Sequence, residues 1–301
     1  MTLANSLEMQ SDTSRTAESG AGGTVALAAG CGCSGNPSPS SDAAAAQQFV
    51  YALGQIGWRF PSRSVEKEFA QAIGRTDTAG QTDREALHAA LSQRRNRYLV
   101  RQLCWVFSIE GLETYLLLPR DISDYELFVD AVRPAPTPLD LDIVIGTRGG
   151  IAPAGLCNGL SLPMVTVDQI YVFDRETLFA SLPLTDGMDE ELFARTSSEL
   201  LDRILQLADN AGTSDEHRAI NYLAVRYPQL YNQTILAHQN NLSLTAVESR
   251  QSRLNGMRRI VDVILTYTHR ITDVSERYFI RVDVTEQFPF LITKLSPYFD
   301  R

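Results

Sequence analysis

Aromatic residues are confined to one part of the chain, and this confinement limits what can fold. Residues 1–47 contain no aromatic side chain, whereas all 2 Trp, 11 Tyr and 12 Phe lie from Phe49 onward. The first 47 residues are mainly Ser, Thr, Gly and Ala, which cannot bury enough apolar area to offset the entropy lost on ordering. We therefore predict a disordered tail over residues 1–47 and one folded domain over residues 48–301, large enough for its own core.

Charge and hydropathy limit the classes of partner. The formal net charge is −9 and the pI is about 5.0, whereas binding nucleic acid by bulk electrostatics requires an excess of cations. The chain opens without the basic region of a secretory signal, and no apolar run is long enough to span a bilayer. We therefore expect a cytoplasmic protein that binds neither nucleic acid nor membrane.

The chain has four cysteines, Cys31, Cys33, Cys104 and Cys157. Without a secretion signal, reduced thiols are expected rather than a disulfide framework. Cys31 and Cys33 form a CxC pair in GCGCSG, which could give two thiolates to a soft metal but cannot complete a tetrahedral site, so a plain tail is the simpler interpretation. Cys104, in LCWVFSI, is predicted to be a buried apolar residue. The role of Cys157, in a loop rich in Gly and Pro, is left open.

The first part of the domain has the patterns of strands and short helices. Residues 49–58 are predicted to form a strand with a turn or bulge at Gly54 or Gly57. Capping-box patterns predict helices after Thr82, with Glu85, and after Ser123, with Glu126. The other predicted elements are helices over 62–74 and 83–97, a hairpin of strands over 97–109 and 112–118, and strands over 141–147 and 164–173.

A block of helical patterns interrupts the strands. Three helices are predicted over 189–211, 215–226 and 229–240. Strand patterns with period-two alternation follow over 245–250, 258–269 and 277–286. This order indicates an α+β fold with a largely antiparallel sheet and a helical block inserted before the C-terminal strands.

Most common catalytic signatures are absent from the sequence, which has no GxSxG, GxxxxGK[ST], HExxH or CxxC. His217 lies near Asp215 and Glu216, so a carboxylate-assisted imidazole is conceivable, although a solvated first turn of a helix explains the same pattern. We assign no catalytic residue and no cofactor, and a metal remains a minor alternative. Surface positions are predicted for His238, His269, Glu110, Glu113, Asp140 and Asp142.

Arginine supplies nearly all of the positive charge. Of the 27 basic residues only Lys67 and Lys294 are lysines, and genome composition is the simplest explanation. Arginine forks nonetheless suit the carboxylates of an acidic peptide, and a free sheet edge can bind an extended peptide through main-chain hydrogen bonds. The arginines around a predicted turn at Asn255-Gly256 are Arg250, Arg253, Arg258 and Arg259.

Three segments together match the pattern of a known family. They are FVYALGQIGWRF, with Tyr51, Ala52, Leu53, Gly54 and Gly57; TSDEHRAINYLAV, with Arg218, Ala219, Asn221 and Tyr222; and YFIRVDVTEQFPFLITKL. A linker like GCGCSG precedes the family's domain as well. In these features, which cover most of residues 48–300, the chain resembles the C-terminal domain of unknown function of cyanobactin maturation proteases of the PatA and PatG type. It departs from the family at Trp58 and Arg59, where a tyrosine and an aspartate are usual.

The resemblance implies a role in the maturation of ribosomally made, post-translationally modified peptides. The domain has no established activity, and the family's catalysis resides in a separate subtilisin-like protease. We therefore expect a noncatalytic accessory module that binds a precursor peptide or a subtilisin-like maturation protease. The candidate binding residues are Tyr51, Trp58, Arg218, Asn221, Tyr222, Arg250, Arg253, Arg258 and Arg259.

Two alternatives remain open. The protein could be a small peptide-modifying enzyme or metal-binding protein of the same pathway, using His217, Cys157 and the nearby loop. The tail could instead be a fused peptide substrate, because Gly22-Gly23 precedes VALAAGCGCSG in the manner of a leader junction before a core rich in Cys and Ser.

Overall fold

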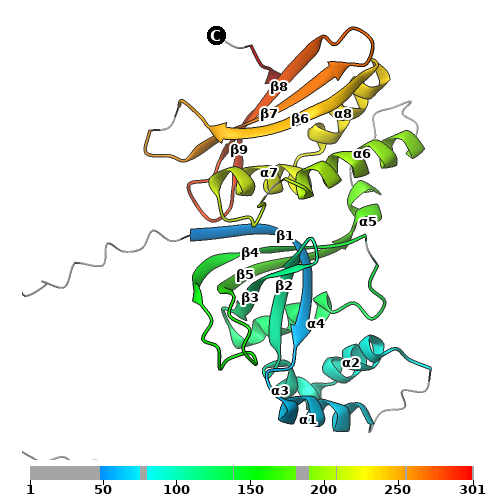
Figure 1. Cartoon of the computed structure of the whole chain (residues 1–301), viewed down its shortest axis with the longest axis vertical. Coiled ribbons are helices and arrows are strands. Elements are labelled where there is room, and N and C mark those ends of the chain that lie inside the picture. The colour runs from blue at the N-terminus through cyan, green and yellow to red at the C-terminus, as the bar shows by residue number, and fades with distance from the viewer. Residues whose placement is uncertain are drawn as a thin grey trace, which may run out of the picture. The chain divides into compact units, whose positions relative to one another are not determined.

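The domain consists of two β-sheets, a group of helices between them and further helices on the far side of the first sheet (Figure 1). The predicted α+β class is confirmed. The tail predicted over residues 1–47, with Cys31 and Cys33, lies outside the residues that the structure describes. The computed structural model describes residues 48–74, 80–137, 139–180, 190–207, 209–254 and 256–299.

The first sheet closes into a five-stranded barrel in the order β1-β2-β3-β5-β4. Neighbouring strands are antiparallel except β3 and β5, which are parallel. With a helix between β3 and β4, this is the topology of an OB barrel. The strands are β1 (Gln48–Arg59), β2 (Cys104–Ile109), β3 (Leu112–Pro119), β4 (Asp140–Ile151) and β5 (Pro163–Asp174).

Strand β1 is continuous over 12 residues and changes partner along its length. It pairs with β4 as far as Gly54 and with β2 from Gln55 onward, without a register shift. The predicted turn or bulge at Gly54 or Gly57 is therefore wrong. Gly54 is needed for close approach instead, because a Cβ at this position would lie 2.3 Å from the carbonyl oxygen of Ser108. The predicted hairpin at Glu110-Gly111 is confirmed, with φ of 50° and 78° at the two turn residues.

Short helices connect the barrel strands. The capping box at Thr82 is confirmed, since its hydroxyl accepts from the Glu85 N–H at 3.2 Å and its own N–H donates to the Glu85 carboxylate at 2.7 Å. The box predicted at Ser123 is wrong, because Asp121 and Asp124 form it two residues earlier. The helices are α1 (Arg63–Gly74), α2 (Asp83–Ser92), η1 (Arg94–Asn96), α3 (Arg97–Val100), η2 (Ile122–Asp124) and α4 (Tyr125–Ala131).

Helix α3 occupies residues that were predicted to be strand. The apolar run before Cys104 is too short for its period to separate helix from strand. The Trp105 indole N–H donates to the Val100 carbonyl oxygen at 3.1 Å and so satisfies an orphan acceptor at the end of α3. The strand therefore begins only at Cys104.

The predicted helical block is confirmed, although its first helix is shorter than expected. Helix α6 ends at Leu205, and Asn210 Nδ2 then donates to the Ile204 carbonyl oxygen at 3.3 Å. Helix α7 begins where Ser214 Oγ accepts from the His217 N–H at 3.0 Å. The helices are α5 (Arg175–Ala180), which the sequence did not predict, α6 (Glu190–Leu205), α7 (Asp215–Arg226) and α8 (Pro228–Gln239).

The second sheet, called sheet B here, is open and antiparallel, in the order β6-β7-β8-β9. Three of its strands fall in the predicted segments, whereas β9 was not predicted. Within the described ranges, no helix is both long and apolar enough to cross a membrane. The strands are β6 (Leu242–Gln251), β7 (Ile260–His269), β8 (Ser275–Asp283) and β9 (Phe290–Pro297).

Three apolar clusters hold these layers together. The barrel interior is filled by large side chains such as Trp105, Phe107 and Phe128. The outer face of β1 and β4 forms one cluster with the helical block and sheet B. The third cluster lies on the outer face of β2 and β3, under residues 152–164. The helical block is therefore packed between the barrel and sheet B (Figure 1).

Gly212, which precedes helix α7, lies directly against strand β1 of the barrel. Its carbonyl oxygen accepts from the Tyr51 N–H at 2.9 Å, and its φ is +70°. A Cβ here would lie 2.5 Å from the Tyr51 carbonyl oxygen and 2.7 Å from the Ala52 Cα. Both the left-handed backbone and the contact with β1 therefore require glycine.

We predict that Gly212→Ala lowers the free energy of unfolding by more than about 2 kcal/mol, because strain and backbone overlap add together. Urea unfolding measures this change. Gly57→Ala is the matched control, since a Cβ there meets nothing within 4 Å. Equal stability of the two variants would contradict the role given to Gly212.

Candidate functional site

The predicted binding residue Arg218 lies inside the protein. Its side chain is 1% exposed and donates to the Val284 carbonyl oxygen at 2.8 Å, to that of Gln287 at 3.2 Å and to that of Glu286. Burial lowers its pKa to about 10, so the group stays charged at neutral pH. These hydrogen bonds connect helix α7 to the segment between β8 and β9.

Asn221, one turn later on α7, connects the same helix to the barrel through hydrogen bonds. Its Nδ2 donates to the Tyr51 carbonyl oxygen at 2.8 Å, and its Oδ1 accepts from Asn210 Nδ2 at 2.8 Å. The Tyr51 and Tyr222 rings meet edge to face at 6.3 Å. Burial raises the pKa of Tyr51, so the phenol is neutral. Tyr51, Arg218 and Asn221 are buried, and Arg218 and Asn221 direct their hydrogen bonds to groups of the same chain.

His217 and Cys157, the pair considered for an enzyme, do not form a catalytic pair. Burial lowers the pKa of His217, which lies in the first turn of α7. Cys157 has no free thiol, because its sulfur is bonded to Cys104. Cys157 therefore offers no thiolate that His217 could activate.

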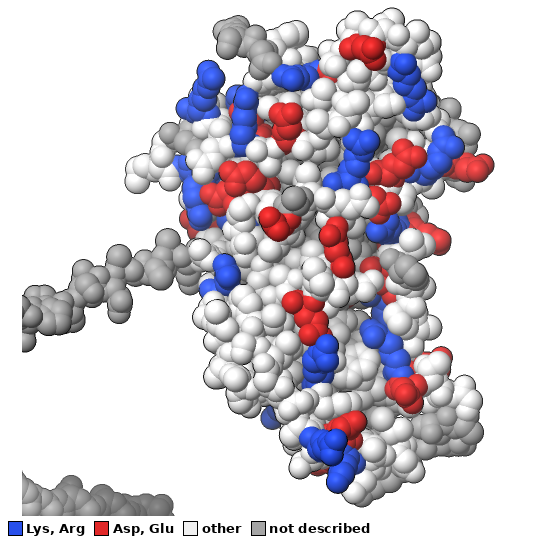
Figure 2. Space-filling view, viewed as in Figure 1, with Lys and Arg blue, Asp and Glu red and all other residues white. Residues whose placement is uncertain are grey.

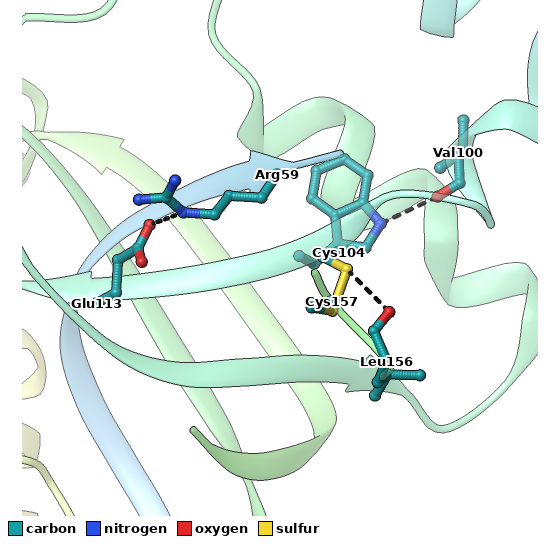
Figure 3. Close-up of a disulfide and its surroundings, with 7 residues drawn as sticks. Arg59, Val100, Cys104, Glu113, Leu156 and Cys157 are labelled. Carbon is teal, nitrogen blue, oxygen red and sulfur yellow. Dashed lines mark hydrogen bonds and ion pairs between the residues drawn. A yellow bond between two sulfur atoms is a disulfide. The ribbon is translucent and has the colours of Figure 1, made fainter. Parts of the chain in front are cut away.

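The Cys104–Cys157 disulfide corrects the expectation of reduced thiols for this pair (Figure 3). It joins the start of β2 to the loop after β4, with a Cα–Cα distance of 6.0 Å. The two residues are 53 positions apart, so their closeness depends on how the loop folds and not on spacing in the sequence. The predicted burial of Cys104 is confirmed, at 6% exposure.

The loop of residues 152–162 covers the outer face of β2 and β3. The Ala152 N–H donates to the Leu162 carbonyl oxygen at 2.8 Å, which closes the base of the loop. Beneath it, Val106 and Leu116 are buried against loop side chains. OB barrels bind oligonucleotides and oligosaccharides on this face, but here the chain itself occupies it, so the topology assigns no ligand.

A hollow of about 620 Å³, called the disulfide hollow here, opens beside this loop. The Arg59 guanidinium donates to the Glu113 carboxylate at one wall (Figure 3). The predicted binding residue Trp58 is in the same wall, with the Arg84 guanidinium 4.8 Å from its ring centroid. The lining residues are Trp58, Arg59, Phe60, Glu66, Glu113, Cys157, Asn158, Gly159 and Leu160.

Asp140 and Asp142 are buried, although they were predicted to lie on a solvated strand face. Asp142 Oδ2 accepts from the Ile56 N–H at 2.7 Å, and its Oδ1 lies 3.0 Å from Arg133 Nη2. Asp140 accepts from the Thr137 N–H at 2.8 Å. Burial raises the pKa of Asp142 to about 6, against the opposing effects of the Ile56 N–H and Arg133.

This raised pKa predicts a pH-dependent stability. Between about pH 4 and pH 6 the folded state holds the Asp142 proton more tightly than the unfolded chain, so stability falls as pH rises through this window. The loss is at most about 3 kcal/mol and is complete above pH 6. We expect wild-type protein to lose stability relative to Asp142→Asn as pH rises, in urea unfolding at several pH values.

Asp130→Asn is the control, because Asp130 is exposed at the end of helix α4. It makes the same change of side chain at an exposed position, so it separates the effect of burial from that of the substitution itself. A difference between wild type and Asp142→Asn that is constant from pH 4 to 7 would contradict the assignment.

The predicted arginine cluster divides into two pairs. Arg258 lies 3.7 Å from Asp283, and Arg259 lies 3.3 Å from Asp215 and donates to the Thr285 carbonyl oxygen at 2.7 Å. These contacts hold the β6–β7 connection against the neighbouring loop. Asn255 of the predicted turn lies outside the described residues.

Arg250 and Arg253 instead line a hollow of about 460 Å³ at the end of sheet B, called the arginine hollow here. The Arg250 guanidinium lies 5.2 Å from the Tyr298 ring centroid and donates to its hydroxyl. Figure 2 shows basic side chains, with acidic ones between them, over this end of sheet B. The lining residues are Arg250, Gln251, Arg253, Leu254, Asp262, Arg281, Tyr298 and Phe299.

A metal centre is not supported by the residues that the structure describes. Among them, no group of three or more His, Cys, Asp or Glu is placed to hold a metal ion. His269 Nδ1 accepts from the Ile271 and Thr272 N–H groups at 3.2 Å, so this nitrogen is engaged in the β7–β8 turn. The sequence did not indicate Arg281 or Tyr298. Arg281 comes near Arg250 through the pairing of β6, β7 and β8, and the position of Tyr298 depends on the pairing of β9 with β8 as well.

Comparison with known proteins shows that part of the chain is similar to a described family and that its fold is similar to a solved structure. Residues 187–298, which span the helical block and sheet B, match a family model described as PatG C-terminal. The fold matches a solved structure titled "PatG Domain of Unknown Function" with a TM-score of 0.66 and 21% identity, over 83% of this chain and 98% of that one. No curated protein matches the chain significantly. The structural match therefore includes the barrel, beyond the region that the family model covers.

Proposed function

We propose that this chain, whose residues 187–298 match the PatG C-terminal model and whose fold is similar to a PatG domain, is a noncatalytic accessory module in peptide maturation of the cyanobactin type. In this proposal it binds an acidic, extended segment of a precursor peptide. The observation that carries the proposal is the arginine hollow at the end of β6, a strand whose outer edge pairs with no other strand in the described part of the chain. Binding to a subtilisin-like maturation protease is the competing outcome of the test.

Charge distinguishes the arginine hollow from the rest of the chain. It is lined by three arginines, Arg250, Arg253 and Arg281, and one aspartate, Asp262, which gives a net charge of +2. The whole chain has a net charge of −9. Arginine forks bind carboxylates in a bidentate manner, so acidic side chains are the ligands that this hollow suits.

Aromatic rings hold two of these guanidinium groups in place. Arg250 is stacked on Tyr298, and Arg281 lies 4.9 Å from the Phe279 ring centroid. Asp262 Oδ1 accepts from Arg281 Nε at 2.8 Å. Such preorganisation reduces the side-chain entropy that a ligand would otherwise have to offset on binding.

An extended peptide also finds main-chain partners here. Strand β6 is the first strand of sheet B, so within the described part of the chain its outer edge pairs with no strand. Peptides commonly bind by adding a strand to such an edge. Arg250 lies at the end of β6 and Arg253 just beyond it, so a strand added to β6 would run toward the arginine hollow.

The experiment uses a fluorescein-labelled peptide of about ten residues, the length of a long strand, with alternating Glu and Val. A peptide with Gln in place of every Glu is the matched ligand. We expect fluorescence anisotropy to show tighter binding of the Glu peptide, with an affinity that falls as salt is added. Arg250→Gln with Arg253→Gln should weaken this binding about fivefold, because two ion pairs are lost.

The control variant is Arg94→Gln with Arg95→Gln, which makes the same change of charge at exposed positions in η1. It should bind the Glu peptide like wild type. Equal loss in both double variants, or equal binding of the Glu and Gln peptides, would refute the site. Binding of the purified maturation protease, but of neither peptide, would favour the competing partner.

A further inference from the structure

We propose that the Cys104–Cys157 disulfide is a redox-controlled latch, which holds the loop of residues 152–162 over β2 and β3 until a thiol reductant opens it. The bond joins the start of β2 to the middle of this loop. When the bond is broken, the loop can leave the barrel while the strands stay paired. The latch lies on the barrel and is independent of the peptide-binding proposal for sheet B.

The disulfide is the buried anchor of an otherwise exposed loop. Between residues 153 and 161, all of which the structure describes, only Cys157 is buried. Leu160 and Leu162 are half-buried and pack against the apolar cluster on the outer face of β2 and β3. Leu156 remains 44% exposed although it is apolar. Apolar packing alone therefore holds the loop much less tightly than packing and the bond together.

Hydrogen bonds within the loop join its residues to one another. In addition to the bond at its base, the Gly159 N–H donates to the Ala154 carbonyl oxygen at 2.8 Å. The Cys104 sulfur lies 3.8 Å from the Leu156 carbonyl oxygen (Figure 3), but a disulfide sulfur has no hydrogen to donate. The hydrogen bonds inside the loop can therefore persist when the loop lifts away from the barrel.

A reductant reaches the bond through the disulfide hollow. Cys157 lines this hollow, whereas Cys104 is not among its lining residues. Its volume of about 620 Å³ is within the range of sites that admit small molecules, so a small dithiol can enter. The Cys157 sulfur is therefore the one that an incoming thiolate meets first, and Cys104 is the leaving group.

The exchange balances with a dithiol as the reductant. One thiolate of the dithiol attacks the Cys157 sulfur, which breaks the Cys104–Cys157 bond, forms a mixed disulfide and releases the Cys104 thiolate. The second thiolate of the dithiol attacks the first sulfur of the same molecule, which closes a cyclic disulfide and releases the Cys157 thiolate. The two protons of the dithiol pass to Cys104 and Cys157, so the protein gains two electrons and the dithiol is oxidised.

Lifting the loop uncovers an apolar row across three strands. Val106 is paired with Leu116, and Leu116 with Met164, so these three side chains are neighbours on one face. Val106 and Leu116 are each 2% exposed while the loop covers them. Leu118 faces the same way and is 37% exposed at the rim. The redox state of the bond thus controls access to the face on which OB barrels bind their ligands.

The test compares the oxidised and reduced forms of the full chain. Dithiothreitol is added without denaturant, and a peptide map after blocking with N-ethylmaleimide measures opening of the bond. Hydrogen exchange, read by mass spectrometry, should become at least about tenfold faster in residues 152–162 after reduction, because the loop opens locally. Peptides of β1 and β7 should keep their exchange rates. The apolar dye 8-anilinonaphthalene-1-sulfonate should bind the reduced form more strongly, and oxidised dithiothreitol should reverse both changes.

Two variants of the loop provide a matched pair. Cys157→Ser removes the bond, so residues 152–162 should exchange rapidly with or without dithiothreitol. Ser161→Ala changes an exposed residue of the same loop and should behave like wild type. The wild-type comparison does not depend on the folding of either variant.

Three results would overturn the proposal. The first is a bond that dithiothreitol cannot open in the folded protein. The second is loop exchange or dye binding that is the same in both redox states. The third is faster exchange throughout the barrel after reduction, because the bond would then stabilise the whole domain and not the loop.

Discussion

The structure depends on one buried cation and the amide that follows it on the same helix. Arg218 places its charge among three carbonyl oxygens of residues 284–287, and Asn221 binds the Tyr51 carbonyl oxygen of the barrel. A buried guanidinium without partners would be strongly destabilising. Helix α7 can therefore keep its place only when the barrel and sheet B are both folded around it.

The predicted binding residues divide into buried ones, which hold the domain together, and exposed ones, which a ligand could reach. Tyr51, Arg218 and Asn221, which the resemblance to the PatG family brought forward, serve the interior. Arg250 and Arg253 lie at the surface of sheet B, in a positive hollow of an acidic chain. The barrel has an OB topology, but the loop of residues 152–162 covers the face that such barrels use, and the peptide-binding site that we propose lies on sheet B instead.

Local chemistry made much of the fold predictable. The capping box at Thr82, the hairpin turn at Glu110-Gly111 and the start of α7 depend on neighbouring residues, and the structure has them where the sequence predicted. Contacts between distant segments were not predictable. The pairing of Cys104 with Cys157 and the burial of Asp142 follow from the closed barrel and from a loop that folds back over it. For the same reason, the sequence indicated Arg250 and Arg253 of the arginine hollow but not Arg281 or Tyr298.

Cooperative unfolding of the barrel and sheet B tests the central claim most directly. Both tryptophans, Trp58 and Trp105, lie in the barrel, so their fluorescence reports on that part alone. Hydrogen exchange of peptides from β7 and β8, read by mass spectrometry in the same urea series, reports on sheet B. If Arg218 and Asn221 join the two parts as described, both probes give the same urea midpoint. Loss of protection in sheet B at a urea concentration where barrel fluorescence remains native would contradict the account.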